Sequence, residues 1–414
     1  MPRAILPRQN ANGAARRTYT ENGMEKCLFC DCDLLPGSEE HVFLSALGGR
    51  IATYRGLCKQ CNNAFANAQT GKVDDALATG FEEIRNGLKV WSGRNGPPPT
   101  LIRAGSMPSG IEFDLAPGFV PVVRPGRLPN QLPVGSEHML AARDEADARR
   151  MLDILAKRGV SAQIGGATHV QQKVGTVHRS PSFDGPKVWR SVAKTAVVSF
   201  VVLYGNEQAR RFVSPELRRA VRHGTPHIAE FAGWDFTNEW PEVVSLEPHS
   251  KTPQAQPSGF EHSVIVADVG KNSVAYVELF GGFRFSVVLG TRAHLPARGL
   301  AVNPREPRPA RFILNVREPE RYAPRYNGSL AFEEAQIRRG IEEAFGRAMQ
   351  KWQEEAQASY TEDLANDLLA RIEQAGDGEA ARMTAINEFA RKLAEVELGS
   401  GWSTDLGNIF IEDE

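Results

Sequence analysis

The sequence predicts an α+β protein of more than one domain, and three observations support that fold class. Four of the five cysteines form two Cys-x-x-Cys pairs near the N-terminus, a pattern typical of a small module built around a bound metal. In the middle of the chain, three apolar runs separated by glycine turns predict an antiparallel β-meander. Beyond them, apolar residues recur at helical spacing and predict C-terminal helices.

Length and composition describe an ordinary globular chain. It has 414 residues, more than one hydrophobic core usually serves, with 41% hydrophobic and 24% charged residues. The formal net charge of −1 means that any nucleic-acid surface must be a local basic patch. The longest apolar run, Ala196 to Tyr204, is shorter than the ~20 residues that a membrane span needs, and we interpret it as a buried helix.

Domain boundaries are expected where proline and glycine gather. Gly96 to Pro99 ends the first helical pattern, and a Pro/Arg-rich stretch at 303–310 predicts a second linker. The predicted organisation is a flexible basic leader at 1–26, a metal-stabilised finger at 27–96, an α+β domain of unknown role at 100–300, and a helical region at 311–414. The leader could contact a phosphate backbone or be a solvated tail.

The later segments have clear secondary-structure signals. Short alternations predict strands at 111–115 and 119–123, and helical spacing predicts helices at 145–158 and 188–204. The predicted meander consists of 262–269, 273–280 and 283–289. Three apolar stripes after Ser329, broken at Gly376 and Gly399, predict three antiparallel helices.

The cysteine pairs predict a structural zinc site. Cys27, Cys30, Cys58 and Cys61 can surround Zn²⁺ as a closed tetrahedron with each sulfur at about 2.3 Å, which leaves no open coordination position. Cys32 could replace Cys30, although Cys30 completes the tighter pair. Because all five cysteines are clustered rather than spread along the chain, we expect a reducing compartment and a cytoplasmic protein.

Polar residues lie at defined positions before, between and after these cysteines. Glu40-His41 precedes an apolar segment and the pair Gly48-Gly49, a short strand is expected at 51–54, and Asn62 directly follows the last cysteine. This order resembles the HNH nucleases, which are ββα-metal fingers, and the resemblance covers about residues 27–80. It implies a two-strand, one-helix finger that cleaves nucleic acid.

The resemblance also implies roles for individual residues. His41 falls at the general base, and Glu40 and Asn62 fall at ligands of a catalytic divalent ion. Two oxygen ligands favour Mg²⁺, with Mn²⁺ as a substitute. The sequence departs from the family at Thr53, where an asparagine often orients the base, and at Ala66, where some relatives have another ligand. The nearest cations for the nucleic-acid backbone, each of which could equally be a solvated charge, are Arg50, Arg55, Lys59 and Lys72.

Two functions follow as expectations. The first is a metal-dependent HNH endonuclease that hydrolyses DNA phosphodiester bonds and leaves 5′-phosphate and 3′-hydroxyl ends, with RNA open as a substrate and no membrane partner. A restriction or anti-phage effector fits this layout by analogy. The alternative is a catalytically silent, zinc-stabilised module that binds nucleic acid or protein. The basic run at 218–223 is either a further nucleic-acid contact or a solvated helix face, and the oligomeric state stays open.

Overall fold

The computed structural model describes residues 25–34, 38–66, 72–106, 112–124, 145–161, 183, 185–236, 240–241, 243–248, 258–305, 311–316, 334–376 and 378–397. The predicted leader therefore lies outside the described residues except for its last two. The chain forms two compact units. The first comprises the chain up to Thr79, Ser92–Asn95 and Phe183–Ile341, and the second comprises Gly80–Trp91, Gly96–Ser182 and Glu342–Glu414.

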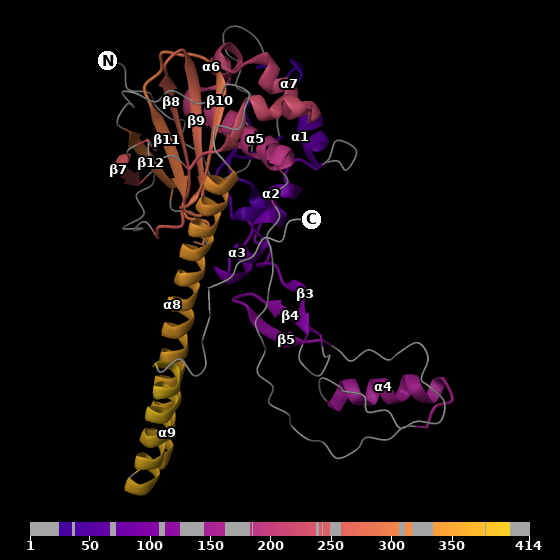
Figure 1. The fold of residues 1–414 in the computed structure, drawn as a ribbon, viewed down its shortest axis with the longest axis vertical. Helices are drawn as coiled ribbons and strands as arrows, with labels where there is room; N and C mark the ends of the chain where they lie inside the picture. Colours follow the sequence, from indigo (N-terminus) through magenta and orange to yellow (C-terminus); the bar gives the residue numbers. More distant parts are fainter. Residues whose placement is uncertain are drawn as a thin grey trace, which may run out of the picture. The chain divides into compact units, whose positions relative to one another are not determined.

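The first unit is built on a seven-stranded antiparallel sheet (Figure 1). Its strand order is β6-β10-β9-β8-β11-β12-β7. The central strands β8, β9 and β10 are rich in valine, alanine and aromatic residues and are largely buried on both faces, and one face of the sheet carries a cluster around the fully buried Tyr276. The strands are β6 (Ala232–Trp234), β7 (Val243–Pro248), β8 (His262–Val269), β9 (Asn272–Leu279), β10 (Phe283–Thr291), β11 (Arg298–Val302) and β12 (Arg311–Val316).

A long buried helix, α5 (Gly185–Tyr204), packs against β6, β8, β9 and β10. Thirteen of its residues between Val188 and Val201 are buried, which is typical of a helix surrounded by protein on all sides. The helices α6 (Asn206–Phe212) and α7 (Pro215–His223) follow, and the short η3 (Pro226–Glu230) leads back into the sheet. Ser214 caps α7 by accepting a hydrogen bond from the Leu217 N–H at 3.0 Å.

The cysteine-rich segment belongs to the same unit. Two short strands, β1 (Glu40–His41) and β2 (Ala52–Thr53), pair antiparallel, with Glu40 opposite Thr53. The turn η1 (Ser45–Leu47) connects them, and the helices α1 (Lys59–Ala66) and α2 (Asp75–Gly80) follow. β1 also contacts α5, so the strand that carries Glu40 is held against the core helix.

The second unit contains a small sheet and the C-terminal helices. Its sheet comprises β3 (Leu101–Ser106), β4 (Glu112–Ala116) and β5 (Val120–Val123), next to α3 (Glu82–Gly87). The buried Asn86 of α3 donates to the Pro99 and Leu115 carbonyls at 2.7 and 2.9 Å. The other helices are α4 (Glu145–Lys157), α8 (Glu334–Ala375), whose first turns lie in the first unit, and α9 (Glu379–Glu397).

Much of the predicted secondary structure is confirmed. The meander is β8-β9-β10, and the helices expected at 145–158 and 188–204 are α4 and α5. The prediction of three C-terminal helices is wrong for the described residues, because the first two stripes lie on one continuous helix, α8. The stretch 311–316, predicted in a helical region, is a sheet strand. Residues 27–96, predicted as one finger, are divided between the two units.

Within the described residues, no helix is both long enough and apolar enough to cross a membrane.

Candidate functional site

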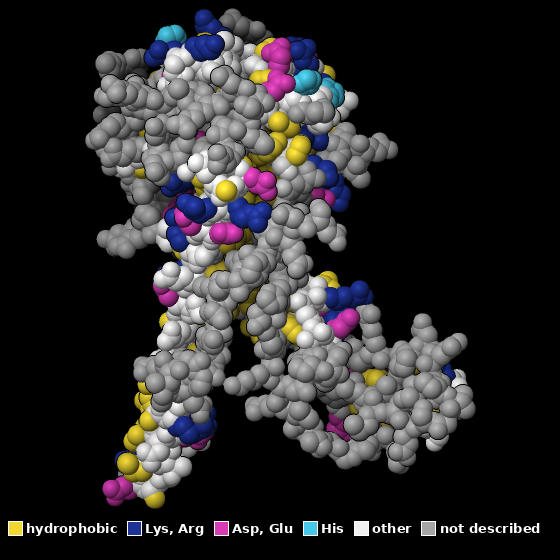
Figure 2. Space-filling model, in the orientation of Figure 1, with side chains coloured by type: hydrophobic (Ala, Val, Ile, Leu, Met, Phe, Trp, Pro, Cys, Tyr) yellow, Lys and Arg dark blue, Asp and Glu magenta, His cyan; other side chains and the backbone are white. Residues whose placement is uncertain are grey.

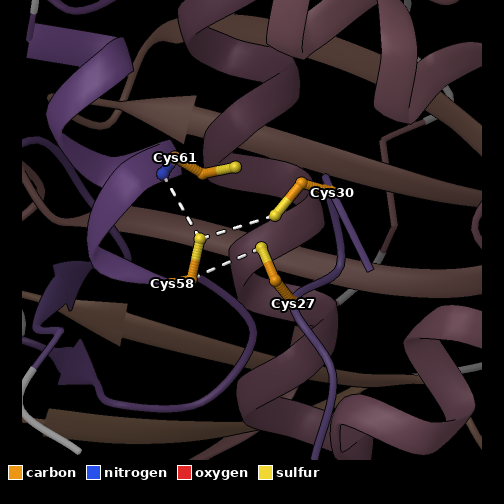
Figure 3. A group of neighbouring side chains, drawn as sticks. All are labelled: Cys27, Cys30, Cys58 and Cys61. Carbon is orange, nitrogen blue, oxygen red and sulfur yellow. Dashed lines mark hydrogen bonds between the residues drawn. The ribbon is translucent and has the colours of Figure 1, made fainter. Parts of the chain in front are cut away.

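The four cysteines of the two pairs point toward one another (Figure 3). Their sulfurs all lie within 4.8 Å of one another, and the sulfurs of Cys30 and Cys58 are 3.5 Å apart. Backbone amides donate to two of them, from Cys58 N to Cys27 Sγ at 3.3 Å and from Cys61 N to Cys58 Sγ at 3.4 Å. The pKa of Cys27 is lowered to about 4, mainly by a hydrogen bond with Cys61 and to a lesser extent by the Cys58 amide, so this sulfur is already ionised without metal.

This donor set fits Zn²⁺. Tetrahedral coordination with four sulfurs at about 2.3 Å requires sulfur–sulfur distances of about 3.8 Å, close to the arrangement here. Burial raises the pKa of Cys30 to about 12, and a hydrogen bond to Cys27 raises the pKa of Cys61 far above its usual range. A divalent cation among the sulfurs would reverse both shifts. The exposed Cys32 is not part of this cluster.

The first cysteine pair is held by side chains from α6 and α7. Asn206 donates to the Lys26 carbonyl at 2.8 Å and Arg210 donates to the Cys27 carbonyl at 3.1 Å. The next two carbonyls, of Leu28 and Phe29, accept from Arg218 at 2.9 Å and Arg222 at 3.1 Å. The predicted basic run therefore places two of its arginines on the cysteine loop rather than in solvent, and the sequence alone did not reveal this pairing.

The turn between β1 and β2 requires glycine. Gly48 has a φ of 86°, and a Cβ on Gly49 would lie 1.9 Å from the Phe43 carbonyl oxygen. The fully buried His262 of β8 fastens the same turn: its Nδ1 accepts from the Phe280 N–H at 3.1 Å, so its Nε2 donates to the Leu47 carbonyl at 2.8 Å. The turn that positions β1 is thus anchored to the sheet.

Glu40 lies in a buried ion cluster with residues far away in the sequence. Lys194 of α5 places its Nζ 2.8 Å from Glu40 Oε1 and 2.7 Å from Asp74 Oδ2, and Ser191 donates to Asp74 Oδ1 at 3.3 Å. Burial raises the pKa of Glu40, an effect that Lys194 opposes. Burial alone would lower the pKa of Lys194, but Asp74 and Glu40 outweigh it and raise that pKa. Lys194 therefore stays charged.

Sequence reasoning missed the partner of Glu40, Lys194, and the second carboxylate on the same ammonium, Asp74. Lys194 stands inside the longest apolar helix of the chain, between Ala193 and Thr195, and its side chain is only 4% exposed. A lysine within an otherwise apolar helix was the available signal, because a buried ammonium needs carboxylate partners.

His41 follows Glu40 on β1, and its imidazole is largely buried. Among the described residues, neither ring nitrogen has a hydrogen-bond partner, although both are shielded from solvent. Burial lowers the pKa of His41, against the opposing effect of the Glu39 carboxylate. The imidazole is therefore neutral at pH 7, and it can accept a proton on one nitrogen. An unpaired buried nitrogen costs about 1–3 kcal/mol, so this side chain is suited to a ligand or a water molecule.

Asn62 lies in the first turn of α1. Its Nδ2 donates to the Glu39 carbonyl at 2.6 Å, which ties the helix to the start of β1. The amide oxygen Oδ1 and the second Glu40 oxygen, Oε2, have no partner among the described residues, so each can still bind an ion. Thr53, which stands where the family often has an orienting asparagine, does not take over that role: neither ring nitrogen of His41 has a partner among the described residues, and Thr53 Oγ1 accepts from the Arg55 N–H at 3.0 Å.

The four cations predicted to contact a nucleic-acid backbone differ in their surroundings. Arg50 donates to Asn95 Oδ1 at 3.2 Å, Lys72 pairs with Asp75 at 3.1 Å, and Arg55 and Lys59 are exposed. A fifth cation, Arg94, is also exposed; its charge weakly opposes the burial that raises the pKa of Glu40 and adds to the burial that lowers the pKa of His41. Arg94, which the sequence analysis did not single out, therefore acts electrostatically on both residues.

No family model, no curated protein and no solved structure matches this chain. Its function is therefore inferred from the residues themselves.

Proposed function

We propose that this protein is a metal-dependent endonuclease of the HNH type that hydrolyses DNA phosphodiester bonds. The observation that carries the proposal is the state of His41: a neutral, buried imidazole whose ring nitrogens have no partner among the described residues, directly after an acidic residue on a strand. A structural histidine normally has its nitrogens paired, as His262 does. A general base instead needs a nitrogen available to its substrate water.

The surrounding groups suit the same reaction. Glu40 Oε2 and Asn62 Oδ1 would hold Mg²⁺ or Mn²⁺, which would supply charge stabilisation to the phosphate when bound. Lys194 fixes the Glu40 carboxylate through its other oxygen, and His41 would take the proton of the attacking water. Arg94 supplies positive charge for a phosphate, and Arg50, Arg55, Lys59 and Lys72 are proposed to contact the nucleic-acid backbone.

The zinc centre has a separate, structural role in this proposal. Four cysteine ligands leave no position for substrate, so zinc would only fix the loop before β1 and the start of α1. That loop is held a second time by Arg218 and Arg222, which places the proposed catalytic strand on a rigid base.

A specific observation favours the alternative, a zinc-stabilised binding module. One oxygen of Glu40 is already paired with Lys194, and the Asn62 amide is already bonded to the Glu39 carbonyl. Both residues therefore have structural partners that would explain their presence without catalysis. The same exposed cations would then bind nucleic acid without cleaving it.

Cleavage of supercoiled plasmid by the zinc-loaded protein separates the two functions. The nuclease proposal predicts nicked or linear DNA with 5′-phosphate ends when Mg²⁺ or Mn²⁺ is added, and intact plasmid when only Zn²⁺ is present. Binding without cleavage across a series of divalent ions, with DNA and with RNA, would support the module instead.

A further inference from the structure

The most exposed aromatic side chain among the described residues lies directly after β2. Tyr54 is 54% exposed, whereas Trp91 and Tyr360, the other exposed aromatic residues, are 48% and 36% exposed. Aromatic side chains usually bury much of their surface, because each one can remove about 150–250 Å² from water. Tyr54 instead leaves its ring open to solvent, beside the strand pair that carries His41.

The backbone on both sides of Tyr54 is fixed. Thr53 Oγ1 accepts from the Arg55 N–H at 3.0 Å, which closes a tight bend around Tyr54. The next residue, Gly56, has a φ of 100°, and its carbonyl accepts from the Leu28 N–H at 2.7 Å. A Cβ on Gly56 would lie 3.2 Å from a side chain of α5. The exposed ring is therefore mounted on a segment that is attached to the cysteine loop and packed on the core helix.

The hydroxyl end of the Tyr54 side chain is also held. The Glu39 carboxylate raises the pKa of Tyr54, by its charge and by accepting a hydrogen bond from the phenol. The backbone of Glu39 is fixed in turn, because its carbonyl accepts from Asn62 Nδ2 at 2.6 Å. A tyrosine ring that is held at both ends loses little further conformational entropy on binding a ligand, and the exposed part of such a ring can serve as a contact surface.

Tyr54 lies on the His41 side of the β1–β2 pair. His41 is paired with Ala52, and successive residues of a strand alternate between its two faces. The face of His41 therefore continues to Glu39 on one strand and to Tyr54 on the other, in agreement with the hydrogen bond between these two side chains. Residues in such a diagonal relationship are about 7–8 Å apart, so the ring of Tyr54 is a near neighbour of His41.

Charge alone does not mark a path for nucleic acid over the first unit. On the face drawn in Figure 2, the described Lys and Arg side chains of this unit are interspersed with Asp and Glu. Phosphate contacts by Arg55 and Lys59, the exposed cations that follow Tyr54, would therefore need support from a contact to the bases. An aromatic ring supplies such a contact for any sequence, because every base has a π-face.

We propose that Tyr54 stacks on an unpaired nucleobase next to the phosphodiester bound at His41, so that single-stranded DNA is the preferred substrate. This proposal rests on the nuclease function proposed above. In a duplex, adjacent base pairs cover both faces of each base, and a protein ring can stack only on a base that is unpaired or flipped out of the helix. The exposed ring of Tyr54 would therefore select unpaired nucleotides, whereas cations that contact phosphates bind paired and unpaired strands alike.

Binding of zinc-loaded protein to a single-stranded oligonucleotide, without Mg²⁺ or Mn²⁺, tests the stacking separately from cleavage. The oligonucleotide carries a fluorescent purine analogue whose emission is quenched by stacking. We expect Tyr54→Ala to weaken binding about tenfold, the size of one base–aromatic stack, and to remove the quenching. Tyr54→Phe keeps the ring and should bind like the wild type, whereas Tyr54→Leu has no aromatic face and should be as weak as the alanine variant.

Two comparisons serve as controls. Tyr360→Ala removes another exposed tyrosine, on α8 in the second unit, and should not change the affinity. A duplex of the same sequence should lose much less affinity than the single strand in Tyr54→Ala, and circular dichroism confirms that each variant is folded. Wild-type affinity of Tyr54→Ala for the single strand, an equal loss for the duplex, or a phenylalanine variant as weak as alanine would each overturn the proposal.

Cleavage separates this proposal from the function on which it rests. With Mg²⁺ or Mn²⁺, the wild type should cleave the single strand about tenfold faster than the duplex, and Tyr54→Ala should lose that preference. Cleavage that depends on His41 but shows no preference for single strands would overturn the role of Tyr54 and leave the nuclease function intact. Absence of cleavage together with Tyr54-dependent binding would overturn the nuclease function and support the stacking contact. The same series with single-stranded RNA identifies which nucleic acid supplies the base.

Discussion

Lys194 Nζ lies 2.8 Å from Glu40 Oε1 and 2.7 Å from Asp74 Oδ2, and its side chain is 4% exposed. This contact joins the strand of the candidate site to the core helix α5. One ammonium between two carboxylates leaves the cluster with a net negative charge, which favours a further cation nearby. The stability of the first unit and the position of Glu40 therefore depend on the same side chain.

Replacing Lys194 with methionine should destabilise the protein by about 3–5 kcal/mol, because Glu40 and Asp74 would lose their buried counter-charge. Urea unfolding followed by circular dichroism measures the change. Lys271→Met is the control, since Lys271 is exposed in the turn after β8 and should change stability by no more than about 0.5 kcal/mol. Equal urea midpoints for the two variants would show that the ion cluster contributes nothing to the stability of the folded state.

The zinc assignment predicts different results for two cysteines in the same loop. Cys30→Ser removes a ligand and should reduce the bound zinc, with loss of thermal stability, because zinc binding contributes to folding. Cys32→Ser changes an exposed thiol outside the cluster and should keep one zinc per chain. Metal analysis of the purified proteins measures the zinc content of each variant. Normal zinc in the Cys30 variant together with loss of zinc in the Cys32 variant would show that Cys32, not Cys30, is the ligand.

The arginines of α7 should control how long the cysteine loop holds its metal. Arg222→Ala removes a charged hydrogen bond to the Phe29 carbonyl, of the kind that contributes about 1.5–3 kcal/mol, and zinc transfer to a chelator should become roughly tenfold faster. Arg219→Ala, three residues earlier on the same helix, breaks only an exposed contact with Glu216 and should leave the rate unchanged. Identical zinc-release rates for the two variants would show that the arginines of α7 do not control how long the cysteine loop holds its metal.

His262 predicts a loss of stability in acid. Burial lowers its pKa to about 4 from an ordinary value of 6.5, so the unfolded chain binds the proton more readily than the folded one between these values. Its contribution is complete above pH 6.5 and is lost as the pH falls toward 4, on the order of 3 kcal/mol in total. Unfolding free energies at pH 7 and pH 5 should differ more in the wild type than in His262→Gln.

The exposed His223 provides the comparison for that measurement. His223→Gln should keep the full wild-type difference between pH 7 and pH 5. If the His262 and His223 variants behave alike, then the acid sensitivity arises from other groups.

The sequence predicted local features better than partnerships. The meander and α5 were predictable because alternation and helical spacing are written into adjacent residues. The clustering of the two cysteine pairs was also predictable, since each pair forms a local turn and four thiolates have one preferred geometry around zinc. The Lys194–Glu40 pair, more than 150 residues apart, has no such local signature, and the arginines that hold the cysteine loop looked like a solvated helix face. The sequence analysis predicted two helices in place of α8, because the apolar residues of its first half and of its second half form two separate stripes.

The most direct test of the account is the rate of plasmid cleavage by His41→Ala in Mg²⁺ or Mn²⁺, compared with wild type and with His223→Ala at equal zinc content. As the proposed general base, His41 should account for at least a hundredfold of the rate, whereas the exposed His223 should account for none. Cleavage by His41→Ala at the wild-type rate, or the absence of cleavage by every protein under all divalent ions, would contradict the assignment of this site as a nuclease.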